Sequence, residues 1–198
     1  ALHIVQFPKN YENFTEEKLV HAICSQVPKN CGLFVISHVL TASGLVMPLE
    51  KIAEVLKKRG VIMVIDGAHS WGSIDLTEFN FSLVDAYCFN LHKWMRGPKG
   101  VGFAWINQNL QQRIKPRLAG WTSFESIDIF EAFAPGHRWT SSMLMMGCRN
   151  FAPFYAISEC LNQFRMKPKS YFKNLLSLRN KLELEFVKNL KVHPLNRK

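Results

Sequence analysis

The stretch that decides the fold is GVIMVIDGAHS, residues 60–70, in which a run of apolar residues ends at an aspartate. Residues 61–65 have no polar interruption, which is typical of a strand buried on both faces of a parallel sheet. The preceding amphipathic stretch, residues 49–59, predicts a helix that ends at Gly60. Another apolar run, residues 33–39, comes before that helix. This alternation of strand, helix and strand indicates an α/β fold with right-handed crossovers.

Further elements are predicted on both sides of this stretch from the spacing of the apolar residues. Thr15 can cap a helix, because apolar residues recur after it at helical spacing, at Leu19, Val20, Ile23 and Val27. A loop is expected from Asp66 to about residue 84. The other expected strands cover residues 2–7, 86–89 and 101–106, and the short connection between the last two permits an antiparallel edge. The other expected helices cover residues 107–114, 150–164 and 171–190.

The composition is that of an ordinary globular protein, since 47% of the 198 residues are hydrophobic and 12% are aromatic. A chain of this length can form one domain with a substantial core. No run reaches the roughly 18 apolar residues that a membrane-spanning helix requires, and the N-terminus lacks a signal-peptide pattern. We therefore expect a soluble protein with no membrane contact.

The cysteines indicate a reducing compartment. Their number, five, is odd, and no two have the C-x-x-C spacing, so we expect neither a disulfide framework nor a metal site. An N-terminal targeting segment could have been removed, so a cytoplasmic location and the mitochondrial matrix both stay open. The five are Cys24, Cys31, Cys88, Cys148 and Cys160.

Positive charge is concentrated at the C-terminal end. The formal net charge is +10, and residues 165–198 hold ten Lys or Arg against only Glu183 and Glu185, a local balance of +8. Such a segment could contact nucleic acid or an acidic protein. The other interpretation is a solvated helix face, because no nucleic-acid-binding motif accompanies the charge.

Two polar sites follow strands and could carry chemistry. Asp66 ends one predicted strand, and His92-Lys93 lies just past another. In open α/β sheets, ligands bind beyond the carboxyl ends of the strands. A lysine and a carboxylate at one sheet edge suit pyridoxal 5'-phosphate (PLP), because lysine forms the imine and the acid pairs with the pyridine nitrogen. An aspartate after a strand and a His-Lys pair also occur in many folds without a catalytic role.

Two longer segments resemble the cofactor-lysine region of class V aminotransferases, the fold-type I PLP enzymes that include cysteine desulfurases. They are VIDGAHSWGSIDL, residues 64–76, and DAYCFNLHKWMRGPKGVGF, residues 85–103. The tryptophan after the His-Lys pair is similar to the isopenicillin-N-epimerase-like and C–S lyase-like branch. The match extends to residues 37–48 and 146–161. It implies the three-layer PLP-dependent transferase large domain, a mostly parallel sheet with helices on both faces.

The resemblance also implies roles for particular residues. Lys93 would hold the cofactor as a Schiff base, and Asp66 would pair with its pyridine nitrogen. His69 would lie near the phenolic oxygen, and Thr41 would approach the same side.

The residues just before the lysine are implied in phosphate binding. Asn90 and His92 would both reach the phosphate of PLP. For Thr41 and Asn90 a purely structural polar role stays open, and each histidine could instead be a satisfied core residue.

Several parts of the family pattern are missing or changed. In many relatives a Gly-Thr pair of the partner subunit donates to the phosphate, and the corresponding pair here is Gly147-Cys148. A thiol donates more weakly than a hydroxyl, so phosphate binding would be reduced unless Cys148 is inert packing. An upstream phosphate loop and a downstream substrate-binding arginine are absent. We expect residues 1–165 to be a partial large domain, incomplete at the N-terminus. Residues 166–198 would form a basic linker helix toward a mostly missing small domain.

Two functional hypotheses follow from these observations. The first is a homodimeric PLP enzyme that acts on an amino acid or a sulfur-containing amino acid. Its reaction would be of the C–S lyase, desulfurase, epimerase or aminotransferase type. The second is a catalytically inactive PLP-fold protein that serves as a scaffold or assembly component through its basic C-terminal segment.

Overall fold

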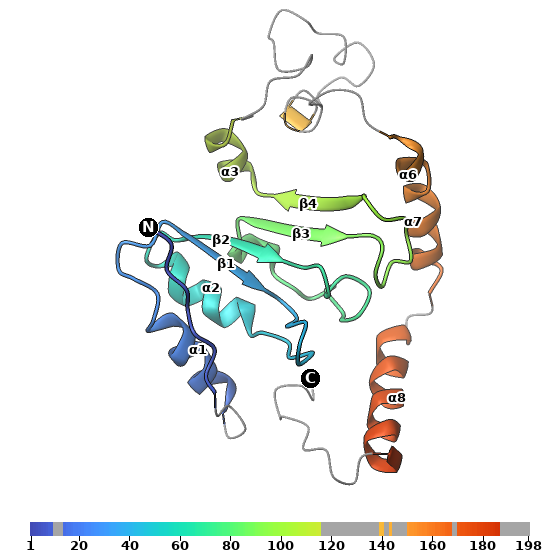
Figure 1. Cartoon of the computed structure of the whole chain (residues 1–198), viewed down its shortest axis with the longest axis horizontal. Coiled ribbons are helices and arrows are strands. Elements are labelled where there is room, and N and C mark those ends of the chain that lie inside the picture. Colours follow the sequence, from blue (N-terminus) through green and yellow to red (C-terminus); the bar gives the residue numbers. More distant parts are fainter. Residues whose placement is uncertain (10–13, 116–138, 141–142, 144–149, 168–169, 187–198) are drawn as a thin grey trace, which may run out of the picture.

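A four-stranded sheet forms the centre of the computed structural model, which describes residues 1–9, 14–115, 139–140, 143, 150–167 and 170–186 (Figure 1). In spatial order the strands are β1 (Leu33–Ser37), β2 (Ile62–Asp66), β3 (Ala86–Asn90) and β4 (Gly102–Ile106). β1, β2 and β3 are parallel, and β4 pairs with β3 in the antiparallel direction. The predicted α/β architecture with an antiparallel edge is therefore confirmed.

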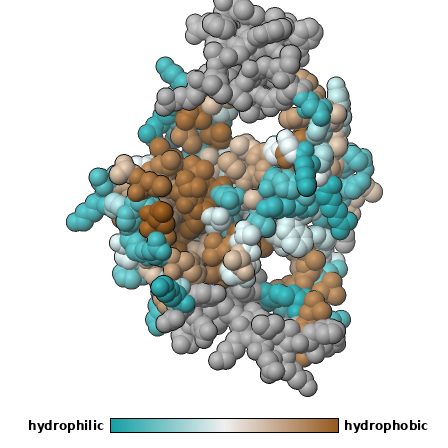
Figure 2. Space-filling view, viewed as in Figure 1, coloured by the Kyte–Doolittle hydropathy of each residue, from teal (hydrophilic) through white to brown (hydrophobic). Residues whose placement is uncertain are grey.

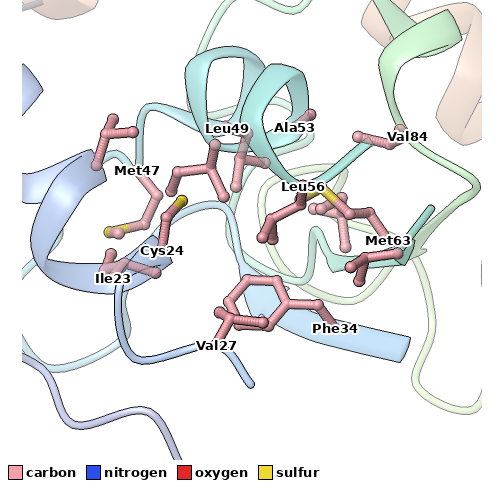
Figure 3. Packing of buried hydrophobic residues seen from close by; sticks show 14 of the residues in the cluster. Ile23, Cys24, Val27, Phe34, Met47, Leu49, Ala53, Leu56, Met63 and Val84 are labelled. Atoms are coloured by element: carbon pink, nitrogen blue, oxygen red, sulfur yellow. The ribbon is translucent and has the colours of Figure 1, made fainter. Parts of the chain in front are cut away.

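Helices α1 (Glu16–Cys24) and α2 (Leu49–Lys57) cover one face of this sheet. Thr15 caps α1 as predicted, since its hydroxyl accepts a hydrogen bond from the Lys18 backbone N–H at 3.3 Å. Apolar residues recur at helical spacing in α1 and α2, so each helix has one apolar face. These faces pack against the strands in a single core. Figure 3 shows this packing, to which the segments contribute Ile23, Cys24, Val27, Phe34, Met47, Leu49, Ala53, Leu56, Met63 and Val84.

The opposite face of the sheet carries apolar residues that are open to solvent. Leu33 and Val35 of β1 point away from the helix-covered core and are 56% and 61% exposed. Figure 2 shows apolar side chains at the surface on the left half of the view, in the area that α1, α2 and the strands occupy in Figure 1. The described helices α1 and α2 therefore bury one face of the sheet only.

The remaining elements follow the sheet in sequence. A short 3-10 helix, η1 (Phe81–Leu83), precedes β3, and α3 (Gln108–Arg113) follows β4. After the undescribed stretch come α6 (Ala152–Tyr155), α7 (Ile157–Arg165) and α8 (Tyr171–Phe186). α7 packs its residues Ile157, Leu161 and Phe164 against the small core of Leu91, Met95 and Val101, which flanks the loop between β3 and β4.

Two sequence-based predictions of elements are wrong. Residues 2–7 form no strand; instead, the Gln26 side chain accepts from the Gln6 backbone N–H and donates to the Gln6 carbonyl, both at 2.9 Å. A side-chain amide therefore takes the place of a neighbouring strand. The helix predicted over residues 150–164 is two helices, because Ala156 (φ −79°, ψ −10°) interrupts the hydrogen-bond ladder between α6 and α7.

Other boundaries differ by a few residues. The strand predicted over residues 33–39 ends at Ser37, and the helix predicted over 49–59 ends at Lys57. The C-terminal part of the helix predicted over 171–190, residues 187–190, lies outside the described residues. Within the described ranges, no helix combines the length and the apolar character needed to cross a membrane.

Candidate functional site

Three polar residues end the three parallel strands. Ser37, Asp66 and Asn90 are the last residues of β1, β2 and β3. Ser37 is in register with Asp66, and Asp66 with Cys88, two residues before Asn90, so all three side chains lie on the same face of the sheet. The Ser37 hydroxyl donates to Oδ2 of Asp66 at 3.5 Å. The carboxyl edge of the sheet is therefore polar where ligands bind in open α/β folds.

A tight turn after β2 carries Asp66 and His69. The Asp66 Oδ1 atom accepts a hydrogen bond from the Ala68 backbone N–H at 2.9 Å, and the Ser70 N–H donates to the Gly67 carbonyl at 3.0 Å. Gly67 has no room for a side chain, since a Cβ atom there would lie 2.0 Å from Cε1 of Tyr87. We refer to residues 66–70 as the Asp66–Ser70 turn.

Lys93 meets this turn from the next strand connection. The Lys93 Nζ atom lies 2.8 Å from His69 Nε2, and both residues are partly buried. One of these nitrogens must accept and the other donate, so a proton can be held between them. The loop after Lys93 is tight, because Gly97 N–H donates to the Leu91 carbonyl at 2.7 Å and Arg96 has a left-handed φ of 59°.

The other predicted site residues are less closely connected. Asn90 lies at the same sheet edge, and its Oδ1 atom is buried without a hydrogen-bond partner among the described residues. His92 is exposed beside Lys93, and Thr41 is exposed in the turn after β1. The structure thus places Lys93 against His69, in the turn that begins at Asp66. It connects neither Thr41 nor His92 to these residues by a hydrogen bond among the described residues.

Three buried polar residues behind the Asp66–Ser70 turn were not predicted as functional. They are His38, Ser70 and Tyr87. Burial lowers the pKa of His38 to about 4, and burial likewise raises the pKa of the Tyr87 hydroxyl. All three lie inside segments that carry the family resemblance, which is the signal that could have identified them. His38 is in residues 37–48, Ser70 in residues 64–76 and Tyr87 in residues 85–103.

Two further features bear on the predictions. The Gly147-Cys148 pair, expected near the phosphate, lies outside the described residues. Within the part of the chain that the structure describes, no group of three or more His, Cys, Asp or Glu side chains could hold a metal ion.

Comparison with protein families settles the kinship of the chain. The family model described as aminotransferase class-V matches residues 2–187. The chain belongs to the class-V aminotransferase family. The resemblance read from residues 64–76 and 85–103 is therefore confirmed.

Individual class-V relatives match about half of the chain. An isopenicillin N epimerase of Streptomyces clavuligerus is 35% identical over 100 residues, which are 50% of this chain and 25% of the epimerase. A probable cysteine desulfurase of Pyrococcus abyssi is 29% identical over 101 residues, 51% of this chain and 25% of the desulfurase. The matched part therefore spans about a quarter of the length of these curated relatives.

Solved structures show the same fold. An apo cysteine desulfurase of Thermococcus onnurineus superposes with a TM-score of 0.61 at 22% identity and covers 83% of this chain and 41% of that enzyme. A cysteine desulfurase of Escherichia coli gives a TM-score of 0.62 at 18% identity, over 84% and 41% of the two chains. These likenesses confirm that the sheet and its helices are part of a PLP-dependent transferase large domain.

Proposed function

We propose that the chain supplies the cofactor-bonding part of a PLP enzyme that acts on an amino acid or a sulfur-containing amino acid. The observation that carries the proposal is the 2.8 Å contact of Lys93 Nζ with His69 Nε2, three residues after Asp66. A lysine amine, an imidazole and a carboxylate at one sheet edge are the groups that class-V aminotransferases use with this cofactor.

The residues present fit PLP. Among the described residues, Oδ2 of the Asp66 carboxylate has only the 3.5 Å hydrogen bond from Ser37, so this oxygen can pair with a protonated ring nitrogen. Asn90 Oδ1 is a buried acceptor without a described partner, as expected where a polar ligand binds. When bound, PLP supplies an electron sink for a carbanion at the substrate's α-carbon.

The chain's own residues would have separate roles in binding the cofactor and in proton transfer. Lys93 bonds the cofactor and then holds or moves a proton at Nζ, with His69 as its hydrogen-bond partner. Asp66 would orient the ring through its nitrogen, and His69 would lie near the phenolic oxygen. Asn90, His92 and Thr41 are proposed as further cofactor-binding residues, the first two toward the phosphate.

The reaction type is drawn from the relatives. Their names include an epimerase and cysteine desulfurases. This range supports a reaction that begins with loss of a group or proton from an amino acid, of the C–S lyase, desulfurase, epimerase or aminotransferase type. The non-catalytic scaffold gains no support from these relatives, because they are named as enzymes.

Further properties are proposed on weaker grounds. The family resemblance supports a homodimer, and the free cysteines Cys24, Cys31, Cys88 and Cys160 agree with a reducing compartment, cytoplasmic or mitochondrial. We retain residues 1–165 as a partial large domain and residues 166–198 as a linker segment. The +8 balance of residues 165–198 supports contact with an acidic protein or nucleic acid.

The proposal is tested by the visible absorbance of the protein mixed with PLP. Wild-type protein is expected to give the band of covalently bound cofactor, and Lys93→Ala to lose it, because no other described amine lies beside His69. Lys99→Ala is the matched control, since Lys99 is an exposed lysine six residues further on and should leave the band unchanged.

Two results would contradict the proposal. A wild-type protein without the band does not bond PLP, and a Lys93→Ala variant that keeps the band bonds it elsewhere. Product analysis with cysteine, a cysteine conjugate and alanine, measured as pyruvate, sulfide or racemised amino acid, then identifies the reaction type.

A further inference from the structure

Three buried polar side chains lie in line behind the Asp66–Ser70 turn. His38 is 5% exposed, and Ser70 and Tyr87 are fully buried. His38 Nδ1 forms a short hydrogen bond with the Tyr87 hydroxyl, and this hydroxyl lies 2.7 Å from Ser70 Oγ. Ser70 Oγ in turn donates to the Gly67 carbonyl at 2.9 Å. The line begins at the end of β1, crosses β3 and ends inside the turn.

The donors in this line can all point the same way. Ser70 has one hydroxyl proton and gives it to the Gly67 carbonyl, so Ser70 Oγ must accept from Tyr87. The Tyr87 proton is then used, and its oxygen accepts from His38. His38 must therefore carry its proton on Nδ1. Because burial lowers its pKa to about 4, the imidazole is neutral at pH 7 and Nε2 carries no proton.

We propose that His38, Tyr87 and Ser70 form a one-directional hydrogen-bond chain that positions the Asp66–Ser70 turn and, through it, His69 for its contact with Lys93. The role rests on the proposed function, since it is the Lys93 site that the chain would serve. None of the three touches the reacting atoms, so they are positioning residues.

The turn is attached to this chain at Asp66 and at Ser70, its first and last residues, and β3 holds Gly67 between them. The His38 backbone N–H donates to the Asp66 carbonyl at 2.9 Å, and the Gly67 N–H donates to the Cys88 carbonyl at 2.7 Å. Between them, Gly67 lies directly on the Tyr87 ring. His69 lies between Gly67 and Ser70, two residues after the first and directly before the second, so its backbone is held on both sides.

A purely structural role for these polar groups is less consistent with their surroundings. The Tyr87 ring is enclosed by aromatic rings, with centroids 5.6 Å away for Phe79, 5.5 Å for Phe81 and 4.4 Å for Phe89. Phenylalanine would fill this place without burying a hydroxyl, and a buried polar group costs free energy unless it is hydrogen-bonded. The hydroxyl is therefore placed for the bonds it makes under the turn.

The experiment compares Tyr87→Phe with Phe81→Leu. The first variant removes only the hydroxyl, and the second alters the packing around the same ring without touching the hydrogen-bond chain. In cofactor-free protein, the 15N signals of the imidazoles report which nitrogen of His38 is protonated and whether His69 Nε2 is bonded to Lys93. His38→Gln and His69→Gln assign these signals, and Ser70→Ala tests the chain from its other end should Tyr87→Phe not fold.

We expect His38 to be protonated on Nδ1 in the wild type. Tyr87→Phe should move the His69 Nε2 signal in the direction that Lys93→Ala moves it, while Phe81→Leu leaves it in place. Affinity for PLP should then fall about tenfold in Tyr87→Phe, the change that loss of one well-formed hydrogen bond corresponds to.

The inference is overturned if His38 is protonated on Nε2, if Tyr87→Phe leaves the His69 signal unchanged, or if Phe81→Leu has the same effect. These signals are read without cofactor. A wild type that fails to bond PLP therefore contradicts the proposed function, while the fate of the hydrogen-bond chain is decided independently.

Discussion

Gly67 lies with its backbone against the ring of Tyr87, so the position of Asp66 and His69 depends on a residue without a side chain. A Cβ atom at Gly67 would lie 2.0 Å from Tyr87 Cε1 and 2.9 Å from the Cys88 carbonyl oxygen. We expect Gly67→Ala to lower the free energy of unfolding by about 2 to 3 kcal/mol, because either the ring or the strand must move. Urea denaturation measures this change.

Gly32→Ala is the matched control for that substitution. No atom lies within 4 Å of the Cβ position at Gly32, which precedes β1. Its free energy of unfolding should change by less than about 1 kcal/mol. Equal losses in the two variants would show that the turn tolerates a methyl group and that Gly67 has no special place in the site.

His38 makes the stability of the protein depend on pH. Its folded pKa is about 4 because of burial, below the ordinary value of 6.5. Between these values the unfolded state binds the proton and the folded state does not, so the free energy of unfolding falls as the pH falls from about 6.5 toward 4. The loss amounts to about 3 kcal/mol at the lower end. Urea denaturation at a series of pH values measures it.

The control for this pH dependence is a second histidine. Replacing His38 with Gln should flatten the pH profile in that window, whereas replacing the exposed His3 with Gln should not. His38 borders a cavity of about 230 Å³ that is also lined by the charged residues Glu16, Glu50 and Lys51. These three residues are therefore kept unchanged in both histidine variants. A His38→Gln profile as steep as that of the wild type would contradict the prediction.

At the scale of elements, one arginine connects the two helices that cover the sheet. Arg59, just after α2, donates through Nη2 to the carbonyls of Val27 at 2.8 Å and Pro28 at 2.5 Å, and through Nη1 to Cys24 at 3.4 Å. These carbonyls end or follow α1, where the helical hydrogen-bond ladder stops. We expect Arg59→Met to lower the free energy of unfolding by about 1 to 3 kcal/mol.

Lys58→Met is the control for this prediction. Lys58 is the exposed cation next to Arg59, and its loss should change the free energy of unfolding by at most about 0.5 kcal/mol. Thermal or urea unfolding would measure both variants. If Lys58→Met were as destabilising as Arg59→Met, general charge would be responsible instead of the bonds to the α1 carbonyls.

The elements that sequence analysis predicted correctly are those with a strong local signal. The apolar run at residues 61–65 and the Thr15 cap both encode their element within a few residues, and both are confirmed. Residues 2–7 are also mostly apolar, yet they form no strand, and the Gln26 side chain takes up the Gln6 backbone groups. A strand depends on a partner that its own residues do not specify.

At the scale of the whole molecule, the chain has the sheet and the helix-covered face of a class-V large domain. The family model matches residues 2–187, while the matched part of the S. clavuligerus epimerase is 25% of that relative. Leu33 and Val35 leave apolar surface on the other face of β1. The activity proposed for the whole protein rests on the carboxyl edge of the sheet, at Asp66 and Lys93.

The sequence by itself determined the α/β architecture, the family and the candidate residues Asp66, His69 and Lys93, because apolar periodicity and contiguous motifs are local properties. Only the tertiary structure decided that Lys93 Nζ meets His69 Nε2, and that His38 and Tyr87 lie behind the turn of Asp66. These contacts join residues 24 and 49 positions apart. Strand order and register bring them together, and neither is written in any single segment.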